Sequence, residues 1–428
     1  MEYLQSNRYW SPLKKISFRF IFIFFILFMV IQNNGTFPFW EIVMHYPAEL
    51  LQKLIPWIGK HVLHLSYDIT EFTNGSGDTT YDYVVVFTIA CSAFAGTVIW
   101  SLLDRKRKSY QTLYYWLTTA VRYYVALMLF NYGLWKVIKM QFPAPDLYRL
   151  TQPYGDSSPM GLAWTFLGFS KGYNLFMGFA EIAALLLLFR RTMTLGAVIT
   201  LCTTANVMAV NYFYDVPVKI VSSMLFIMTL FLLSNDATRL LRFFLTDNPV
   251  SLPPIKAPVF SKKWMHIAKA SLKTLLIGYT IIFGIYEAKQ MEKKYGDTAP
   301  KPKLYGLYNV DTFVINNDTL PPLITDTIRW KEFLIEWEGF ARLQDMTDRT
   351  SMFTIIQDTI SKKIDFIPKA DTALKYTLYY DTPGSNKLNF KGMIQKDSVS
   401  IFMTRKDTKD FLLMNRGFNW INEYPFNR

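Results

Sequence analysis

Two charged residues, Arg122 and Glu181, lie inside long apolar stretches of this 428-residue sequence. A charge within a membrane span is costly unless it has a partner or a water-filled cavity. Each residue lies roughly nine positions from the inner end of its expected span, so both would sit ~13 Å above the same boundary at 1.5 Å per residue. We therefore predict that Arg122 and Glu181 neutralise each other, either to specify the helix arrangement or as an intramembrane site for a proton, an ion or a head group.

A second group of polar residues gathers at the opposite, outer ends of the apolar stretches. Between two of these stretches, Ser158-Pro159 is a favoured helix start, with Ser as N-cap and Pro at the first helical position. The residues 160–168 that follow span only ~14 Å as a helix and are too short to cross a bilayer. We expect this helix to dip in and return, or to lie flat, at the outer mouth of a helix bundle.

The free N–H groups at the start of this short helix suit an acidic or carbonyl ligand. The alternative is a lid that closes the bundle without binding a ligand. The residues that we predict to bind the ligand are Lys136, Arg149, Tyr154, Asp156, Ser158, Asn174, Asn211 and Asp215.

Metal-binding and catalytic signals are weak in this sequence. Cys91 and Cys202 both lie in apolar stretches, and no C-x-x-C motif occurs. His61, His64 and Asp68 could share one face of a helix, but a metal site needs further ligands than these provide. We therefore expect no resident metal and assign no catalytic residue. Enzymatic activity stays open, as does a bound quinone, which would bring its own chemistry.

The elements that must position these residues are apolar helices. Half of the sequence is apolar, and seven stretches have about the 20-residue length of a membrane span. Residues 1–294 carry 28 Lys and Arg against 16 Asp and Glu, and the basic residues cluster in short connections. This distribution indicates membrane topology rather than nucleic-acid binding, with the N-terminus inside and the C-terminal part outside. The predicted spans are 16–33, 83–103, 113–135, 171–189, 193–212, 216–233 and 268–288.

From Tyr305 onward the pattern changes to short alternating segments that are typical of strands. We therefore predict a mainly α membrane protein, a bundle of about seven transmembrane helices, with a C-terminal antiparallel all-β domain. That domain would be a small barrel or a sandwich, and a lipocalin-like barrel is one form of it. The expected domains are 1–110 (first spans and an outer-loop helix), 111–245 (a four-helix unit), 246–294 (inner linker and last span) and 295–428 (the β domain).

Residues 113–245 resemble the DoxX family of small four-span membrane proteins. The motifs that carry the resemblance are Arg122 with Gly133-Leu-Trp-Lys136, Gly178-Phe-Ala-Glu181, and the inner turn 188–196. The segment 153–161 and the closing RGFNWINEYPF are similar to a variant of the family found in larger bacterial proteins with an outer β domain. The resemblance implies a multi-pass protein of the bacterial inner membrane with a periplasmic β domain.

Some relatives in that family are associated with respiratory or sulfur oxidation, or with maturation of periplasmic redox enzymes. Three functions therefore stay open. The first is a membrane protein that binds a lipid, a quinone or a small anion at the outer mouth, with the β domain as gate or partner-binding module. The second is a membrane subunit of a quinone-linked oxidoreductase, and the third is a small-solute transporter. The expected partners are the lipid bilayer and a periplasmic or membrane protein.

Overall fold

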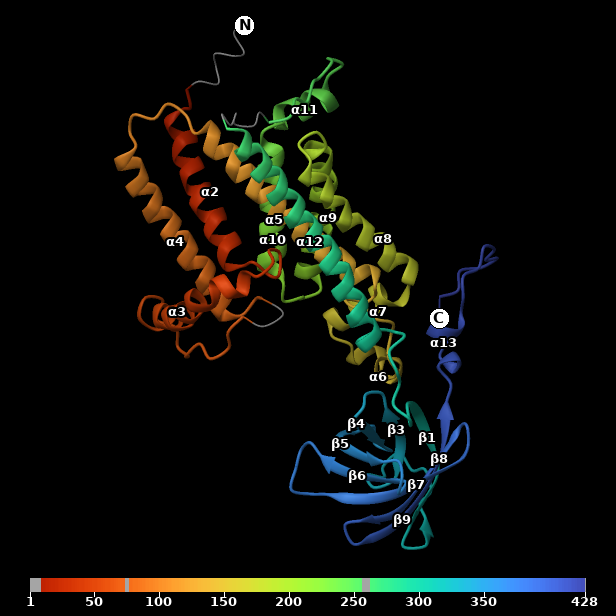
Figure 1. The fold of residues 1–428 in the computed structure, drawn as a ribbon. Helices are drawn as coiled ribbons and strands as arrows, with labels where there is room; N and C mark the ends of the chain where they lie inside the picture. Colours follow the sequence, from red (N-terminus) through yellow and green to blue (C-terminus); the bar gives the residue numbers. More distant parts are fainter. Residues whose placement is uncertain (1–8, 74–76, 256–261, 428) are drawn as a thin grey trace. The chain divides into compact units, whose positions relative to one another are not determined.

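The computed structural model describes residues 9–73, 77–255 and 262–427, and its internal contacts divide the chain into two units (Figure 1). The helical unit comprises Met1–Pro143 and Ser158–Asp297, and the β unit comprises Ala144–Ser157 and Thr298–Arg428. The predicted combination of apolar helices with an antiparallel β domain is confirmed. The segment Ala144–Ser157, which we expected within a four-helix unit, belongs instead with the strands.

The helical unit is built from helices that pack mainly in pairs. α2 packs against α4, α5 packs against α8 and its continuation η3, and α9 packs against α10. The helices of this unit are α2 (Pro12–Ile31), α3 (Trp40–His61), α4 (Thr80–Leu103), α5 (Gln111–Val137), α7 (Pro159–Phe169), α8 (Lys171–Ile182), η3 (Ala183–Leu188), α9 (Met193–Phe213), α10 (Lys219–Ser234), α11 (Ala237–Leu245) and α12 (Lys263–Tyr295).

α5 is the central helix of this unit. It contacts α2, α8, η3, α10 and α12, and every residue from Tyr124 to Phe130 is buried. A helix that is buried on all sides lies inside a bundle. α5 therefore buries its polar residues Arg122 and Lys136 against neighbouring helices.

Among the residues that the structure describes, four helices are long and apolar enough to cross a membrane: Thr80–Leu103, Lys171–Leu188, Met193–Phe213 and Lys263–Tyr295. The pair α10 and α11, bent by 77°, would make a fifth if the two form one broken span. Within the described residues this is fewer than the seven predicted spans. α2 and α5 are helical where spans were predicted, but three basic residues in α2 and many polar residues in α5 distinguish them from these four.

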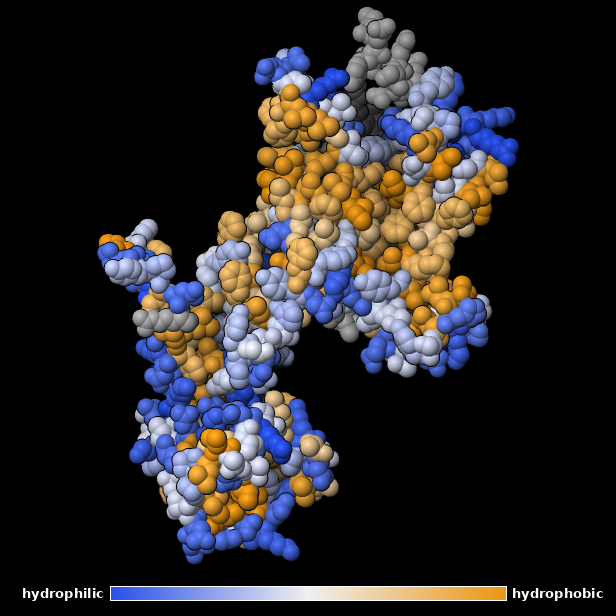
Figure 2. Space-filling model, turned by 180° about the vertical axis from the view of Figure 1, so that it is seen from behind, coloured by the Kyte–Doolittle hydropathy of each residue, from blue (hydrophilic) through white to orange (hydrophobic). Residues whose placement is uncertain are grey.

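Large apolar side chains remain exposed along the helices. Phe94 and Leu103 of α4, Phe176 of α8, and Leu275 and Ile282 of α12 are all mostly exposed. Figure 2 shows apolar surface, in orange, over the helices of this unit, with polar residues, in blue, toward the helix ends. Soluble monomers rarely expose continuous apolar surface of this extent, so several of these helices have the character of membrane segments.

The β unit contains an eight-stranded antiparallel barrel. β1 and then β3 to β9 pair in sequence order, β1 also pairs with β9 to close the sheet, and the short β2 extends β1. The structure therefore selects the barrel over the sandwich. The strands are β1 (Gly306–Ile315), β2 (Asp318–Thr319), β3 (Trp330–Ile335), β4 (Phe340–Asp345), β5 (Thr350–Asp358), β6 (Lys363–Pro368), β7 (Tyr376–Gly384), β8 (Lys387–Ile394) and β9 (Asp397–Lys406).

Aromatic side chains fill the barrel. The rings of Phe333, Phe366 and Phe390 have centroid distances between 5.3 and 5.9 Å, and Trp330 stacks on Phe333 at 5.9 Å. Tilted and edge-to-face contacts of this kind add stability beyond the burial of apolar area. The centre of the barrel is therefore a packed core.

The β unit also includes α6 (Leu147–Thr151). The Glu336 carboxylate accepts hydrogen bonds from the backbone N–H groups of Leu147, at 2.7 Å, and of Tyr148, at 3.3 Å. Arg342 Nη2 donates to the Thr151 hydroxyl at 2.5 Å. Glu336 thus supplies acceptors for N–H groups that have no partner inside the first turn of a helix, and this contact attaches α6 to the barrel.

The contribution of Glu336 to the stability of the β unit should depend on pH. Burial raises the pKa of the Glu336 carboxyl, and Asp146 raises it further, while the two N–H donors and Lys301 oppose the shift. The folded unit therefore binds a proton at Glu336 more readily than the unfolded chain does. The stability that this group contributes is fully present below its ordinary pKa and is lost as pH rises through the raised value.

We expect the thermal unfolding midpoint of the β unit, followed in the full-length protein, to be higher in mild acid than at neutral pH. Glu336→Gln should flatten this dependence because the amide does not titrate. A variant with the pH profile of the parent protein would contradict the assignment to Glu336.

Candidate functional site

A buried ion pair lies where α5 crosses α8. Lys136 Nζ is 2.7 Å from each carboxylate oxygen of Glu181, and the two side chains are only 6% and 3% exposed. The Lys136 ammonium also lies 5.6 Å from the ring centroid of Phe142. Because both charges are removed from solvent, each is stable in this place only through the other.

Two glycines allow the helices to approach closely enough for this pair. A Cβ atom on Gly133 would lie 2.7 Å from the Gly178 carbonyl oxygen, and one on Gly178 would lie 2.8 Å from the Gly133 carbonyl oxygen. Lys136 and Glu181 each follow their glycine by three residues and therefore lie on the same helix face as the crossing point. The Gly-x-x-Lys and Gly-x-x-Glu motifs thus form the two halves of one contact.

The predicted pairing of Arg122 with Glu181 is wrong, because Lys136 is the partner of Glu181. Arg122 is buried, and its Nε donates to the carbonyl oxygen of Leu187 at 2.6 Å. That carbonyl lies in η3, where the 3₁₀ turn replaces the α-helical pattern of hydrogen bonds. The similar depth of Arg122 and Glu181 in their predicted spans did not identify the partner of Glu181. The Gly-x-x-Lys and Gly-x-x-Glu motifs would have identified it.

Ser158 and Asn174 have structural roles at the two ends of α7. The Ser158 hydroxyl accepts a hydrogen bond from Gly161 N at 3.0 Å, as predicted for an N-cap followed by Pro159. Asn174 is fully buried, and its Nδ2 donates to the carbonyl oxygen of Leu167 at 2.8 Å. Asn174 therefore connects α7 to α8, and its donor is not directed toward a ligand.

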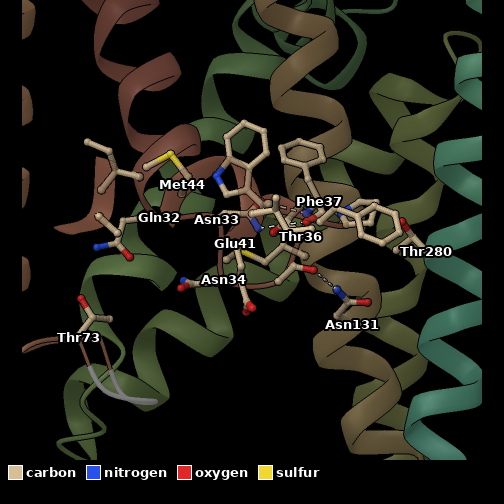
Figure 3. Close-up of a pocket in the computed structure, with 18 of the residues that line it drawn as sticks. Gln32, Asn33, Asn34, Thr36, Phe37, Glu41, Met44, Thr73, Asn131 and Thr280 are labelled. Atoms are coloured by element: carbon tan, nitrogen blue, oxygen red, sulfur yellow. Dashed lines mark hydrogen bonds between the residues drawn. The ribbon is translucent and has the colours of Figure 1, made fainter. Parts of the chain in front are cut away.

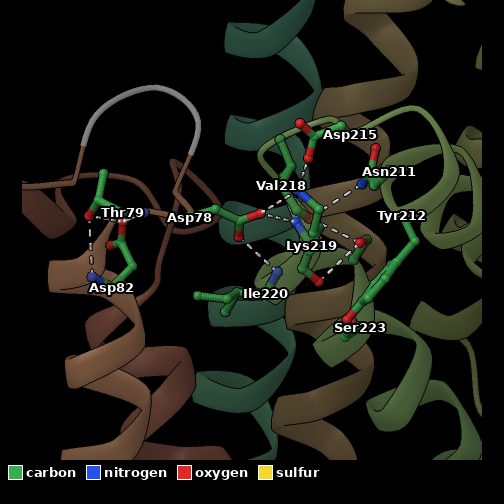
Figure 4. A network of polar contacts seen from close by, with 11 residues as sticks. Asp78, Thr79, Asp82, Asn211, Tyr212, Asp215, Val218, Lys219, Ile220 and Ser223 are labelled. Atoms are coloured by element: carbon green, nitrogen blue, oxygen red, sulfur yellow. Dashed lines mark hydrogen bonds and ion pairs between the residues drawn. The ribbon is translucent and has the colours of Figure 1, made fainter. Parts of the chain in front are cut away.

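Asn211 and Asp215 lie at the connection between α9 and α10 (Figure 4). Asn211 Nδ2 donates to Val218 O at 3.3 Å, and Lys219 Nζ lies 3.0 Å from Asp215 Oδ1. The nearly buried carboxylate of Asp78 accepts from the backbone N–H of Lys219 at 2.7 Å and caps α10. These polar groups satisfy one another and hold the connection in place.

The remaining predicted residues, Arg149, Tyr154 and Asp156, belong to the β unit. Arg149 Nη1 donates to Gln152 Oε1 at 2.5 Å, and the Tyr154 side chain is largely exposed. The eight residues that we predicted to form one ligand site are therefore divided between the two units, and those in the helical unit have separate partners.

A large pocket lies elsewhere in the helical unit, between the α2–α3 connection, α3, α5 and α12. Its volume is about 1090 Å³. Figure 3 shows Gln32 and Thr73 on one side, Asn131 and Thr280 on the other, and the α2–α3 connection between them. Large aromatic residues line it as well: Phe37, Phe39, Trp40, Trp135, Tyr279 and Phe283.

The polar lining of this pocket consists mainly of amides and carboxylates. The amides are Gln32, Asn33, Asn34, Gln52 and Asn131, and the carboxylates are Glu41, Glu49 and Glu287. His45 also lines it, 3.6 Å from Glu49, and no Lys or Arg occurs among the described lining residues. Asn131 Nδ2 donates to Gly35 O at 3.2 Å and so links α5 to the α2–α3 connection. The buried hydroxyl of Thr36 has no hydrogen-bond partner among the described residues. The pocket therefore suits an apolar molecule with a neutral or cationic polar group better than an anion.

Sequence reasoning located polar residues at the same ends of α5 and α9 but missed this pocket. Three of its amides occur as the run Gln32-Asn33-Asn34 directly after α2, followed by Phe37, Phe39 and Trp40. Such a cluster of amides and aromatics at a helix end was a usable signal. No group of three or more His, Cys, Asp or Glu residues that could hold a metal occurs within the described residues.

Comparison with known proteins gives one relative, the uncharacterized protein YwoB of Bacillus subtilis (strain 168). The two are 40% identical over 126 residues, which make up 29% of this chain and 79% of YwoB. This chain therefore belongs to the same family as YwoB. No family model and no solved structure matches the chain.

Proposed function

We propose that this member of the YwoB family is an integral membrane protein that binds a lipid-like molecule in the pocket between α3, α5 and α12. The observation that carries the proposal is the combination of a volume of about 1090 Å³ with an aromatic wall, uncharged amides and no Lys or Arg among the described lining residues. Pockets for small molecules are commonly of this size, mostly apolar, and supplied with a few oriented polar groups.

The membrane setting is supported by the four helices of sufficient length and apolarity and by their exposed apolar surface. We propose the inner membrane of a bacterium, with the N-terminus inside, because basic residues cluster beside the helix ends that this orientation places in the cytoplasm. In this orientation the pocket opens at the outer end of the bundle, since it is lined by the end of α2 and the last turns of α5. The β unit would then be periplasmic and available as a gate or as a binding surface for a partner protein.

The resemblance to the DoxX family is part of the same proposal. α5, α8 with η3, α9 and α10 contact one another as a four-helix group, and two of the three motifs that carry the resemblance meet in the Lys136–Glu181 pair. If this chain shares the four-helix group with the DoxX family, the Lys136–Glu181 pair belongs to the common scaffold, and the ligand binds in the separate pocket.

The ligand class follows from the lining of the pocket. A quinone is neutral, and its carbonyl oxygens accept hydrogen bonds from amide N–H groups such as those of Asn34 and Asn131. A lipid with an amine head group would instead interact with Glu41 or Glu287 and with the aromatic rings. The quinone alternative favours a role as membrane subunit of a quinone-linked oxidoreductase, and the amine alternative favours lipid binding without redox chemistry.

Filling the pocket with a side chain should displace its occupant. Gly284 lines the pocket, and a Cβ atom there would lie 3.3 Å from Leu134 Cδ1. We expect Gly284→Leu to weaken binding of the quinone or lipid that co-purifies with the protein by roughly 5- to 150-fold, since overpacking typically costs about 1–3 kcal/mol. Mass spectrometry of extracts from the purified protein measures the amount and identity of the bound molecule.

Gly278→Leu provides the matched control on the same helix. A Cβ atom at Gly278 has no neighbour within 4 Å, so this variant should retain as much ligand as the parent protein. Equal retention by the Gly284 and Gly278 variants would contradict the proposed pocket. Retention of a quinone would favour the oxidoreductase subunit, and retention of an amine lipid alone would exclude it.

A further inference from the structure

A cluster of basic residues surrounds the end of η3, outside the lining of the pocket. Arg122 of α5 donates from Nε to Leu187 O at 2.6 Å, and Lys273 of α12 donates from Nζ to Leu188 O at 3.3 Å. Arg190 follows two residues after Leu188. Three separate segments thus bring cationic side chains to one helix end.

These side chains lie close enough to act on one another electrostatically. Lys273 is within the field of Arg122, Arg190 and Lys269, and Arg122 is within the field of Arg190. Lys269 lies one helical turn before Lys273 on α12, so the two side chains leave the helix on the same face. The Lys273 ammonium also lies 4.8 Å from the ring centroid of Phe189.

The described part of the chain does not neutralise this charge. No carboxylate there lies within 4.0 Å of Arg122, Arg190 or Lys273. The carbonyl end of a helix carries only roughly half a negative charge, which is small against three cations. The cluster therefore keeps a positive field that attracts an anion from outside the chain.

The position of the cluster indicates which anion this is. In the proposed orientation α5 and α12 both start at the inner surface, and Lys269 and Lys273 lie within the first three turns of α12. Long basic side chains at this depth extend toward the head groups of the inner leaflet. Basic pockets between helices on the cytoplasmic side are a recurrent form of site for anionic head groups.

We propose that Arg190, Lys269 and Lys273, with Arg122 behind them, bind the phosphate of an anionic phospholipid of the inner leaflet. Arg190 and Lys269 are exposed and Lys273 is half-buried, so a head group can reach all three. Arg122 is buried and stays attached to Leu187 O, where it adds to the positive field. The inference rests on the proposed membrane orientation and is independent of the ligand in the outer pocket.

The test compares lipid affinity in a variant that removes two cluster charges, Arg190→Gln with Lys273→Gln. The probes are phosphatidylglycerol and phosphatidylcholine with the same acyl chains, titrated into the purified full-length protein and followed by native mass spectrometry. Each basic residue near an anionic lipid contributes roughly fivefold to affinity. We therefore expect phosphatidylglycerol to bind ~30-fold more weakly to the variant, with phosphatidylcholine unchanged.

Two controls keep the test specific. Lys289→Gln with Lys293→Gln removes the same charge from exposed positions near the other end of α12 and should leave phosphatidylglycerol affinity unchanged. Arg190→Lys with Lys273→Arg preserves the charge and should bind like the parent protein, which separates loss of charge from loss of fold. Equal affinities in the two glutamine variants would overturn the proposal.

A further arm distinguishes a lipid from a free anion. Millimolar inorganic phosphate should leave the melting temperature of the parent protein in phosphatidylcholine unchanged, whereas phosphatidylglycerol should raise it. If inorganic phosphate raises the melting temperature as much as phosphatidylglycerol does, the site binds a soluble anion and the assignment to a lipid is wrong. The variants Gly284→Leu and Gly278→Leu should not alter the response of the melting temperature to phosphate or to phosphatidylglycerol. The proposed pocket ligand and the proposed phospholipid site can therefore fail independently of each other.

Discussion

Replacing Lys136 with Met should destabilise the helical unit by about 3–5 kcal/mol, because it leaves the buried Glu181 carboxylate without its partner. Both oxygens of Glu181 lie 2.7 Å from the Lys136 ammonium, and its side chain is 3% exposed, so water cannot take the place of the lysine. The measurement is the thermal unfolding midpoint of the detergent-solubilised protein, compared with that of the parent protein.

The double variant Lys136→Met with Glu181→Leu separates the value of the pair from the cost of an isolated charge. Replacing both partners of a buried pair by apolar residues of similar volume is often neutral or stabilising. We therefore expect the double variant to recover most of the midpoint lost in the single variant. A double variant as unstable as the single one would mean that the pair contributes through packing rather than through charge.

Gly178→Ala should also destabilise the crossing of α5 and α8, by about 3 kcal/mol. The new methyl group would lie 2.7 Å from Val137 Cγ2 and 2.8 Å from the Gly133 carbonyl oxygen. A carbonyl oxygen belongs to the backbone and cannot rotate away, so the two helices must separate, and such overpacking typically costs 1–3 kcal/mol. Separation would also lengthen the contact between Lys136 and Glu181.

Gly172→Ala on the same helix is the control for this substitution. A Cβ atom at Gly172 meets only the Ser170 hydroxyl, at 3.8 Å, and alanine favours a helix over glycine by about 1 kcal/mol. This variant should melt at the same temperature as the parent protein or slightly higher. Equal midpoints for the two alanine variants would show that the helices do not meet at Gly178.

Local sequence patterns were sufficient to predict where helices and strands occur. The short alternating segments after Tyr305 predicted strands, and the structure has strands there from β1 to β9, because the side chains of a strand point alternately to its two faces. Ser158-Pro159 likewise predicted the start of α7, since an N-cap acts within one turn. The closure of β1 on β9 did not follow from these patterns, because barrel and sandwich share the same alternation.

Local sequence patterns did not identify which side chains contact each other when the two are far apart in the sequence. Equal depth was the only criterion applied to Arg122 and Glu181, and it does not report which side of each helix a charge occupies. Gly133 and Gly178 decide that side, since they bring α5 and α8 into contact where Lys136 faces Glu181. For the same reason three residues expected near Lys136 lie in the β unit, where Glu336 and Arg342 hold α6.

The sequence by itself determined the apolar helices, the strands and the concentration of basic residues in the first two-thirds of the chain, because hydrophobic periodicity and charge are local properties. Only the tertiary structure decided that Lys136 neutralises Glu181, that the α2–α3 connection and α12 enclose a pocket with α5, and that Arg122, Arg190 and Lys273 share one helix end. Each of these depends on the rotation and distance of helices far apart in the chain. Close packing at a few small or charged residues sets both quantities.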